Sequence, residues 1–333
     1  MLTILNLETT DPAFNLAAEQ YVFDCLPKDR SYFMLWQNDN AIIIGKYQNT
    51  LAEINQPYVE AHKIRVVRRL SGGGAVYHDL GNLNYTFITD AGEQETMNMR
   101  VFCEPIVKAL RLFGVKAEIN GRNDMTIDGK KFSGNAQYLR HGRVMHHGTI
   151  LFDSDLTAVD KALKVDPEKI SAKGIESVRS RVTNIHPYLR EDITMLAFRE
   201  MLLKEIGNTE RSEIYDFSED DRKAIKSIRE ERYGTWEWNY GRSPECTFFR
   251  DGRTEGCGTV EIYISTDHGL ITGIQFRGDF FSARDPEELA PRFIGRKPDA
   301  EGFHQALQDV EPGMYFSGMT KVRMEELLNG LDG

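Results

Sequence analysis

The order of hydrophobic and polar residues predicts short strands and amphipathic helices from the start of the chain. The segment Thr3–Glu8 is typical of a strand, and Asp11-Pro12 supplies an N-cap and a first-turn proline for the helix that follows. Two apolar runs, Tyr32–Trp36 and Ala41–Gly45, flank the turn-forming Asn38–Asn40 and predict a hairpin.

The middle of the chain contains the longest regular patterns. Apolar residues recur at helical spacing in Met99–Phe113, and Gly114 is a typical helix end. Asp128-Gly129 is a turn signal, so we expect Met125–Ile127 to pair with Lys131–Ala136 as antiparallel strands. Further strands are expected at Ile64–Val67, Leu83–Ile88 and Val144–Phe152, and further helices at Leu51–His62, Glu191–Ile206 and Glu219–Glu231.

The pattern changes near residue 243. Three short strand-like runs, Thr247–Arg250, Gly258–Ser265 and Leu270–Phe276, predict an antiparallel meander, and short helical segments follow them. We therefore expect an α+β protein with two domains: residues 1–242, built on a large mixed or antiparallel sheet, and residues 243–333, a small α+β domain.

Composition places the chain among ordinary globular proteins. It has 333 residues, of which 41% are hydrophobic and 28% charged, with a formal net charge of −10. A net negative charge argues against nucleic-acid binding, and no apolar run approaches the roughly 20 residues of a membrane span. We find no signal-peptide pattern and expect a cytoplasmic protein. The four cysteines lack C-x-x-C spacing and predict neither a zinc site nor a disulfide framework.

The segment Arg68–Asp79 contains the strongest functional signal in the chain. Three consecutive glycines leave backbone N–H groups open to a ligand, two arginines precede them, and His78-Asp79 follow. A flexible hairpin tip can also carry three glycines, but it does not require the flanking arginines or the apolar residues after the turn. We interpret this segment, which we call the glycine loop, as a site of anion approach.

Several common active-site patterns are missing from the sequence. There is no P-loop motif and no G-x-G-x-x-G that opens a helix, so the usual nucleotide-binding fingerprints fail. His146 and His147 are adjacent, so on a strand they point to opposite faces and do not chelate one metal ion together; one buried and one exposed side chain is the simplest expectation. No G-x-S-x-G elbow for a nucleophilic serine is present.

A second dense stretch of polar residues lies in Gly121–Ala136. The hairpin at Asp128-Gly129 should bring Asn123 and Asp124 near Ser133. Lysine within a strand pattern is unusual, although Lys130-Lys131 also fits a hairpin tip. If Phe132 occupies the opposite face, Lys131 shares its face with Ser133, and one of the two faces should line the site.

These segments carry a family resemblance. Taken in order, six of them resemble the motifs of lipoate–protein ligases: R-R-L-S-G-G-G-A-V-Y-H-D-L-G-N, G-R-N-D, D-G-K-K-F-S-G-N-A, H-H-G-T-I-L-F, A-K-G-I-E-S-V-R-S-R-V-T-N and W-E-W-N-Y-G. They span roughly residues 3–241, and the acidic segment after them resembles the accessory domain of that family. The resemblance implies a catalytic domain similar to that of biotin–protein ligases. It also implies a two-step reaction in which lipoate (or octanoate) and MgATP form an acyl-adenylate, whose acyl group passes to a lysine.

The resemblance also implies roles for individual residues. Lys131 matches the catalytic lysine, which would bridge the carboxylate and the α-phosphate, and Asp124 is a candidate for the Mg²⁺ that accompanies ATP. The candidates for contact with ATP or the adenylate are Arg69, Gly74, Ala75, Val76, Tyr77, Asn123, Asp124, Lys131, Ser133, Lys173 and Arg179. The candidates for contact with lipoate are Leu16, Ile44, Ser71, Gly72, Gly73, His78, Lys131 and His147.

The implied partners are apo lipoyl domains, such as the glycine-cleavage H protein and the acyltransferase subunits of 2-oxoacid dehydrogenases. A neighbouring family uses a catalytic cysteine without ATP, but Cys25, Cys103, Cys246 and Cys257 all lie outside the motifs. A relay transferase with a protein-bound acyl donor stays open on sequence grounds. A non-catalytic lipoate-binding module is disfavoured because Lys131 and the whole glycine loop are present.

Overall fold

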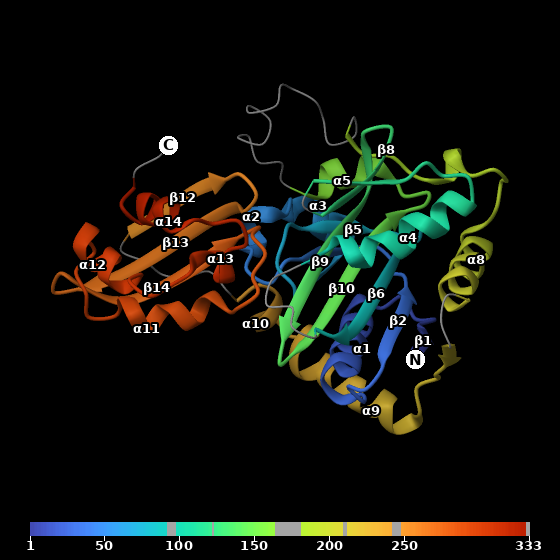
Figure 1. Cartoon of the computed structure of the whole chain (residues 1–333), viewed down its shortest axis with the longest axis horizontal. Coiled ribbons are helices and arrows are strands. Elements are labelled where there is room, and N and C mark those ends of the chain that lie inside the picture. Colours follow the sequence, from blue (N-terminus) through green and yellow to red (C-terminus); the bar gives the residue numbers. More distant parts are fainter. Residues whose placement is uncertain (92–97, 122, 164–180, 209–211, 242–247, 331–333) are drawn as a thin grey trace.

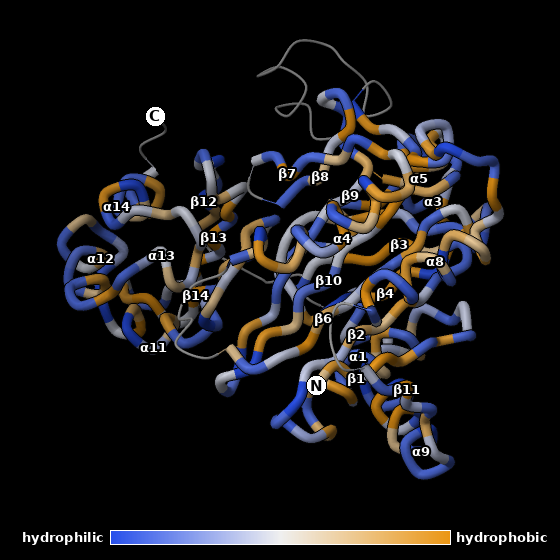
Figure 2. The backbone as a smooth tube through the Cα atoms, turned by 45° about the vertical axis from the view of Figure 1, so that its right-hand side comes forward, coloured by the Kyte–Doolittle hydropathy of each residue, from blue (hydrophilic) through white to orange (hydrophobic). Residues whose placement is uncertain are grey.

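The structure is a computed structural model that describes residues 1–333 except 92–97, 122, 164–180, 209–211, 242–247 and 331–333. It is an α+β structure, as expected, and the described strands form one eight-stranded and two three-stranded sheets. In Figure 1 the elements after residue 247, coloured orange to red, form a separate body beside the rest of the chain. Figure 2 shows hydrophobic segments along the interior strands and hydrophilic loops at the periphery.

The eight-stranded sheet is the centre of the larger body. Its order is β11-β1-β2-β6-β10-β9-β8-β7, with β1 parallel to β2 and β11 and the other neighbouring pairs antiparallel. The sheet is therefore mixed, in agreement with the expected fold class. Its strands are β1 Leu2–Asn6, β2 Ser31–Trp36, β6 Asn82–Asp90, β7 Glu118–Asn120, β8 Asp124–Ile127, β9 Lys130–Arg140, β10 Arg143–Leu151 and β11 Ser212–Ile214.

Helices cover both faces of this sheet. Along β2, Phe33 and Leu35 pack toward α4 (Arg100–Leu112) and α8 (Met195–Gly207), whereas Tyr32 and Met34 pack toward α1 and α9. α1 spans Pro12–Cys25 and α9 spans Glu219–Ile228. Because successive strand residues point to opposite faces, a strand buried on both sides is hydrophobic throughout. This explains the uninterrupted apolar run in β2.

The predicted hairpin across Asn38–Asn40 is wrong. β2 belongs to the large sheet, whereas β3 (Ala41–Ile44) lies between β4 (Arg65–Arg68) and β5 (Val76–His78) in a separate sheet. Asn40 adopts a left-handed φ of 47°. Asn38 is buried, and its side chain forms hydrogen bonds with residues outside the turn. The asparagines therefore pass the chain from one sheet to another instead of closing a hairpin.

Proline divides the helix that was predicted at Leu51–His62. The structure has two shorter helices, α2 (Thr50–Glu53) and α3 (Gln56–Ala61), with Pro57 in the first turn of α3. The intervening Asn55 N–H donates to the carbonyl of Ala162, at the end of α5 (Leu156–Ala162). The remaining helical segments of the larger body are η1 His186–Tyr188, η2 Arg229–Tyr233 and α10 Trp236–Asn239.

The predicted C-terminal meander is confirmed. It consists of β12 (Phe248–Thr254), β13 (Gly258–Asp267) and β14 (Leu270–Gly278), paired antiparallel in chain order. Five short helical segments follow and bury one face of this sheet: η3 Pro286–Leu289, α11 Ala290–Phe293, α12 Ala300–Ala306, α13 Pro312–Tyr315 and α14 Lys321–Leu328. Among the described residues, none of the helices combines the length and apolar character needed to cross a bilayer.

A short segment after β3 joins the two bodies. Tyr47 stacks on Phe280 with ring centroids 4.8 Å apart and lies within the hydrophobic core of the C-terminal body. Its carbonyl accepts from the Gly278 N–H at 2.9 Å, and Lys46 pairs with Asp285 at 2.7 Å. The C-terminal body is therefore held against the base of the glycine loop.

Candidate active site

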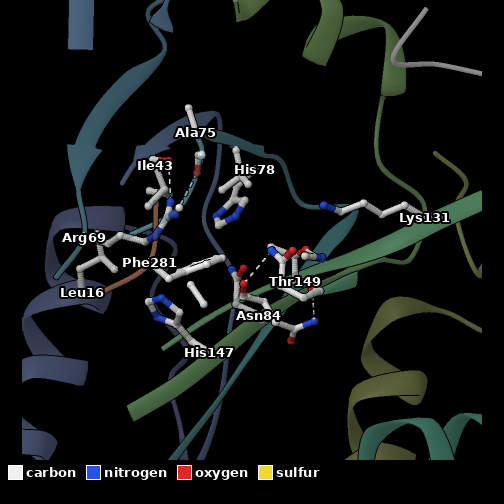
Figure 3. Close-up of a pocket in the computed structure, with 18 of the residues that line it drawn as sticks. Leu16, Ile43, Arg69, Ala75, His78, Asn84, Lys131, His147, Thr149 and Phe281 are labelled. Atoms are coloured by element: carbon white, nitrogen blue, oxygen red, sulfur yellow. Dashed lines mark hydrogen bonds between the residues drawn. The ribbon is translucent and has the colours of Figure 1, made fainter. Parts of the chain in front are cut away.

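Two cavities meet at Lys131. The first cavity is lined by apolar side chains that include Leu16, Trp36 and Ile43. The lining of the second cavity includes Tyr77 and Ser133. Both are also lined by the same central group of residues: Gly74, Ala75, Val76, Lys131, Gly134 and Thr149. In Figure 3 the Lys131 amine projects into the first cavity from its strand.

The strand pattern explains how Lys131 reaches this position. Phe132 is fully buried in the core under α4, so its neighbours Lys131 and Ser133 point to the opposite face of β9, where both line the second cavity. The Lys131 Nζ pairs with the Asp124 carboxylate at 2.7 Å. Both side chains are little more than one-third exposed, so the amine is accessible to a ligand. The expected proximity of Asp124 to this part of β9 is confirmed by the pairing of Asp124 with Gly134.

The glycine loop approaches its neighbours too closely for side chains. A Cβ on Gly72 would lie 2.3 Å from the Phe280 carbonyl oxygen, and Gly73 has a φ of +88°. The Gly73 N–H donates to that same carbonyl at 3.0 Å. Gly73 and Gly74 line the first cavity, but Gly72 faces the C-terminal body, so its predicted contact with lipoate is not supported by its position.

The two arginines of the loop hold the backbone in place. Arg68 is fully buried and donates to the carbonyls of Gly45, Gln48 and Trp238. The Arg69 guanidinium also lines the first cavity, and burial lowers its pKa to about 10. Its hydrogen-bond acceptors are the Ser71 hydroxyl and the carbonyls of Ile43, Gly72 and Gly74. A phosphate contact by Arg69 would have to replace part of this set.

One predicted wall residue is displaced by a single position. Ile43 lines the first cavity, whereas Ile44 points to the other face of β3 and packs with Ile54 and Val59. The expectation that Ile44 lines the site is therefore corrected to Ile43, because adjacent strand residues face opposite ways, and contact with lipoate stays a prediction. Leu16 does line this cavity, as expected.

A buried polar chain borders the first cavity. The Ser71 hydroxyl lies 2.6 Å from His147 Nε2, and His147 Nδ1 lies 3.0 Å from a Glu19 carboxylate oxygen. Ser71 is therefore one layer behind the cavity wall formed by His147. His146 points to the opposite face, as expected, but both histidines are buried, which corrects the expectation that one is exposed. Burial lowers the pKa of His146 well below its usual value.

The remaining predicted residues divide between the two cavities. His78 and Asn123 line the first cavity, whereas Tyr77 and Ser133 line the second. Lys173 and Arg179 lie outside the described residues. Within the described part of the chain, no cluster of three or more His, Cys, Asp or Glu side chains could hold a metal ion.

Sequence reasoning missed several residues of the first cavity or its border, and Glu19, Trp36 and Phe281 show three different reasons. Glu19 lies one helical turn after Leu16 on α1, so the i, i+3 spacing could have indicated it. Trp36 ends β2, close to the wrongly predicted hairpin. Phe281 comes from the C-terminal body, and no sequence signal connects it with the glycine loop.

Comparison with known proteins shows the family of this chain. The family model described as "Lipoyl protein ligase A/B catalytic domain" matches residues 11–207, and "Bacterial lipoate protein ligase C-terminus" matches residues 243–328. The chain belongs to the lipoate–protein ligase family. It is an enzyme of this ligase family, and the family resemblance drawn from the sequence is confirmed.

Two relatives match over almost the whole chain. Lipoate–protein ligase 1 of Staphylococcus aureus is 42% identical over 329 residues, covering 99% of this chain and 100% of that protein. Lipoate-protein ligase LplJ of Bacillus subtilis is 43% identical over 331 residues, covering 98% of this chain and 100% of that protein. Both matches therefore extend across the two bodies of this structure.

Solved structures support the fold. LipL1 of P. falciparum, crystallised in complex with lipoate, aligns with a TM-score of 0.77 at 23% identity, covering 93% of this chain and 95% of that one. A lipoate-protein ligase A bound with ATP aligns with a TM-score of 0.60 at 26% identity, covering 72% of this chain and 98% of that one. A bipartite lipoate protein ligase from Thermoplasma acidophilum, described with its E2 lipoyl domain, aligns with a TM-score of 0.64 at 28% identity. The alignment covers 74% of this chain and 98% of that one.

Proposed function

We propose that this ligase activates lipoate, or octanoate, with ATP to form lipoyl-AMP and pyrophosphate, and then transfers the acyl group to the ε-amine of a lysine on an apo lipoyl domain. The single observation that carries the proposal is the position of Lys131, where the first cavity and the larger second cavity share one wall. An acid bound in the first cavity and a nucleotide bound in the second would meet at this amine.

Charge explains why an amine is needed there. In the first step the lipoate carboxylate attacks the α-phosphorus of ATP, so two anions must approach each other. A fixed cation at their meeting point lowers this repulsion and aligns the reacting atoms. In the free protein Asp124 holds the amine at 2.7 Å, so the lysine is already positioned before substrates arrive.

Magnesium enters as part of the substrate MgATP. Mg²⁺ in such sites is commonly held by one or two carboxylates together with phosphate oxygens and water. The single carboxylate of Asp124, beside Lys131, fits that arrangement, whereas the described residues contain no cluster for a resident ion. Asp124 would contribute one oxygen to the ion as Lys131 turns toward the phosphate.

The remaining groups position the substrates. The backbone of Gly74–Tyr77 borders the second cavity, where its N–H groups would approach the phosphates and the nucleotide, together with Ser133. Asn123, Lys173 and Arg179 stay predicted adenylate contacts. Leu16, Ile43 and Val76 would enclose the acyl chain, and Gly73, His78 and His147 complete that wall.

The second step needs no covalent enzyme intermediate. The acceptor lysine, with an ordinary pKa near 10.4, loses a proton and attacks the anhydride carbonyl, and AMP leaves. Of the described cysteines, Cys25 is exposed on α1, Cys103 and Cys257 are buried, and none of them lines either cavity. This supports the ATP-dependent route over a thioester route. The proposed acceptors are the H protein of glycine cleavage and the acyltransferase subunits of 2-oxoacid dehydrogenases.

Pyrophosphate release tests the proposal. The purified protein is incubated with MgATP and lipoate, with and without an apo lipoyl domain, and pyrophosphate and acceptor mass are measured. We expect lipoate-dependent release in both cases, limited to about one equivalent without acceptor, and a mass increase of one lipoyl group with it. Acceptor modification without pyrophosphate release, or no release in either case, would contradict the proposal.

A further inference from the structure

Two side-chain nitrogens of residues that line the first cavity, His78 Nε2 and Asn84 Nδ2, have no hydrogen-bond partner among the described residues, and the histidine is the one with a ring that can be assigned a tautomer. His78 is 2% exposed, and its Nδ1 lies 3.1 Å from Asn38 Nδ2. Its Nε2 is buried without a hydrogen-bond partner, although the residue lines the first cavity. Because buried polar groups are nearly always paired, an unpaired ring nitrogen at a cavity wall indicates a ligand atom as its partner.

A chain of hydrogen bonds fixes which ring nitrogen carries the hydrogen. Asn15 Nδ2 lies 3.0 Å from the Thr9 carbonyl and 2.8 Å from the Gln37 carbonyl, and carbonyls only accept. That nitrogen also lies 3.0 Å from Asn38 Oδ1, and the opposite orientation would set two N–H₂ groups against each other, so the Nδ2 of Asn38 faces His78. Asn38 then donates to His78 Nδ1, and the single hydrogen of a neutral ring must lie on Nε2.

The ring is neutral in the folded protein. Burial, together with the nearby positive charge of Arg69, lowers the pKa of His78 to about 3. A doubly protonated ring would also place a second donor against the Asn38 amide. His78 therefore offers one N–H donor without a charge.

The position of this donor favours the acyl substrate as its partner. The ring packs edge-on against Trp36 at a centroid distance of 6.3 Å, and His78 lines the first cavity but not the second. Figure 3 shows the His78 ring and the Lys131 amine pointing into the same cavity from different strands. With the carboxylate at Lys131, the part of the substrate that reaches His78 is the acyl chain.

We propose that His78 donates its Nε2 hydrogen to a dithiolane sulfur of lipoate, and that Asn38 and Asn15 are positioning residues that hold the ring in the required tautomer. The inference rests on the proposed function. Sulfur is a weak acceptor, but it is the only acceptor that lipoate carries beyond its carboxylate, and octanoate lacks it. A bound octanoate would leave the N–H unpaired, which makes His78 a determinant of preference for lipoate.

Kinetics with the two acids test this role. In the full-length His78→Phe variant we expect KM for lipoate to rise roughly three- to tenfold while KM for octanoate stays the same or falls, because only lipoate loses a hydrogen bond. Asn38→Leu removes the donor that selects the tautomer. It should raise the ratio of KM for lipoate to KM for octanoate as well, by a smaller factor. His304→Phe, on the exposed face of α12, is the matched control and should change neither value.

Nitrogen NMR of the unaltered protein tests the same role without turnover. With ¹⁵N-labelled histidine, and signals assigned by comparison with His78→Phe, we expect an unprotonated Nδ1 and a protonated Nε2, and an Nε2 signal that moves with lipoate but not with octanoate. A hydrogen on Nδ1, or equal responses to the two acids, would overturn the inference.

The two proposals fail in different ways. Absence of pyrophosphate release with either acid would defeat the proposed function, and the NMR titration would still decide whether His78 contacts the ring. Normal release with an unchanged KM ratio in His78→Phe would contradict only the role of His78.

Discussion

The adjacent residues Lys130 and Lys131 differ in environment although they are one strand position apart. Lys130 is exposed at the start of β9, whereas the Lys131 side chain lies over Gly134 at the junction of the two cavities. A Cβ at Gly134 would lie 3.2 Å from the Lys131 Nζ. The absence of a side chain at residue 134 is therefore part of what positions the amine.

The Gly134→Ala substitution tests this dependence. The added methyl group must displace the Lys131 amine by a few tenths of an ångström, and we expect the rate of adenylate formation to fall by roughly tenfold. Gly273→Ala is the matched control, because the nearest atom to its Cβ would lie at an ordinary 3.7 Å. An unchanged rate in Gly134→Ala would mean that the lysine tolerates displacement.

At the scale of elements, the first cavity needs strands and loops from both bodies. Phe281 follows β14, packs with Met99 and Ala136, and lines the cavity beside the glycine loop. The Phe280 carbonyl also accepts from the Gly73 N–H. The C-terminal body thus contributes directly to the wall that would enclose the acyl chain.

Replacement of Phe281 by Ala should weaken this wall. We expect KM for lipoate to rise by roughly tenfold or more, since a buried aromatic side chain contributes about 2 kcal/mol through apolar contact. Phe249→Ala, on the exposed side of β12, serves as the control. Similar KM values in the two variants would show that Phe281 lies apart from the bound acid.

Sequence patterns predicted the elements better than their arrangement. The meander after residue 247, the strand at Val144–Phe152 and the hairpin at Asp128-Gly129 were predictable, because turn residues and side-chain alternation act over a few positions. The passage of β3 into a second sheet was not, since Asn38 is satisfied by residues distant in the chain.

The candidate site was predictable where a motif is continuous in the chain. The glycine loop and Lys131 are local signals, and the structure brings them to one junction. Phe281 joins the site through tertiary packing, so no local pattern reveals it, whereas Glu19 shares a helix face with Leu16. The domain limits at residues 242 and 243 stay a prediction, as does the likeness to biotin–protein ligases.

At the scale of the whole molecule, buried neutral histidines link stability to pH. The pKa of His78 falls to about 3 and that of His146 falls well below its usual value, both mainly through burial. Below pH 6.5 the unfolded chain binds protons that the folded chain does not, so the stability contributed by these groups is present above that pH and is lost as the pH falls toward 3.

Unfolding in urea at several pH values checks this linkage. We expect the free energy of unfolding to decrease between pH 7 and pH 5. Its slope against pH, which reports the protons bound on unfolding, should be smaller in His78→Phe by the equivalent of up to about one proton. Equal slopes in the two proteins would show that His78 is protonated in the folded state or exposed to solvent there.

The most direct test of the central claim is lipoate-dependent exchange of labelled pyrophosphate into ATP, compared in the unaltered protein, Lys131→Ala and Lys130→Ala. If Lys131 brings carboxylate and α-phosphate together, its loss should slow exchange by roughly 10²–10³, whereas loss of the exposed Lys130 should leave exchange nearly unchanged. Equal exchange rates in Lys131→Ala and Lys130→Ala would contradict the account.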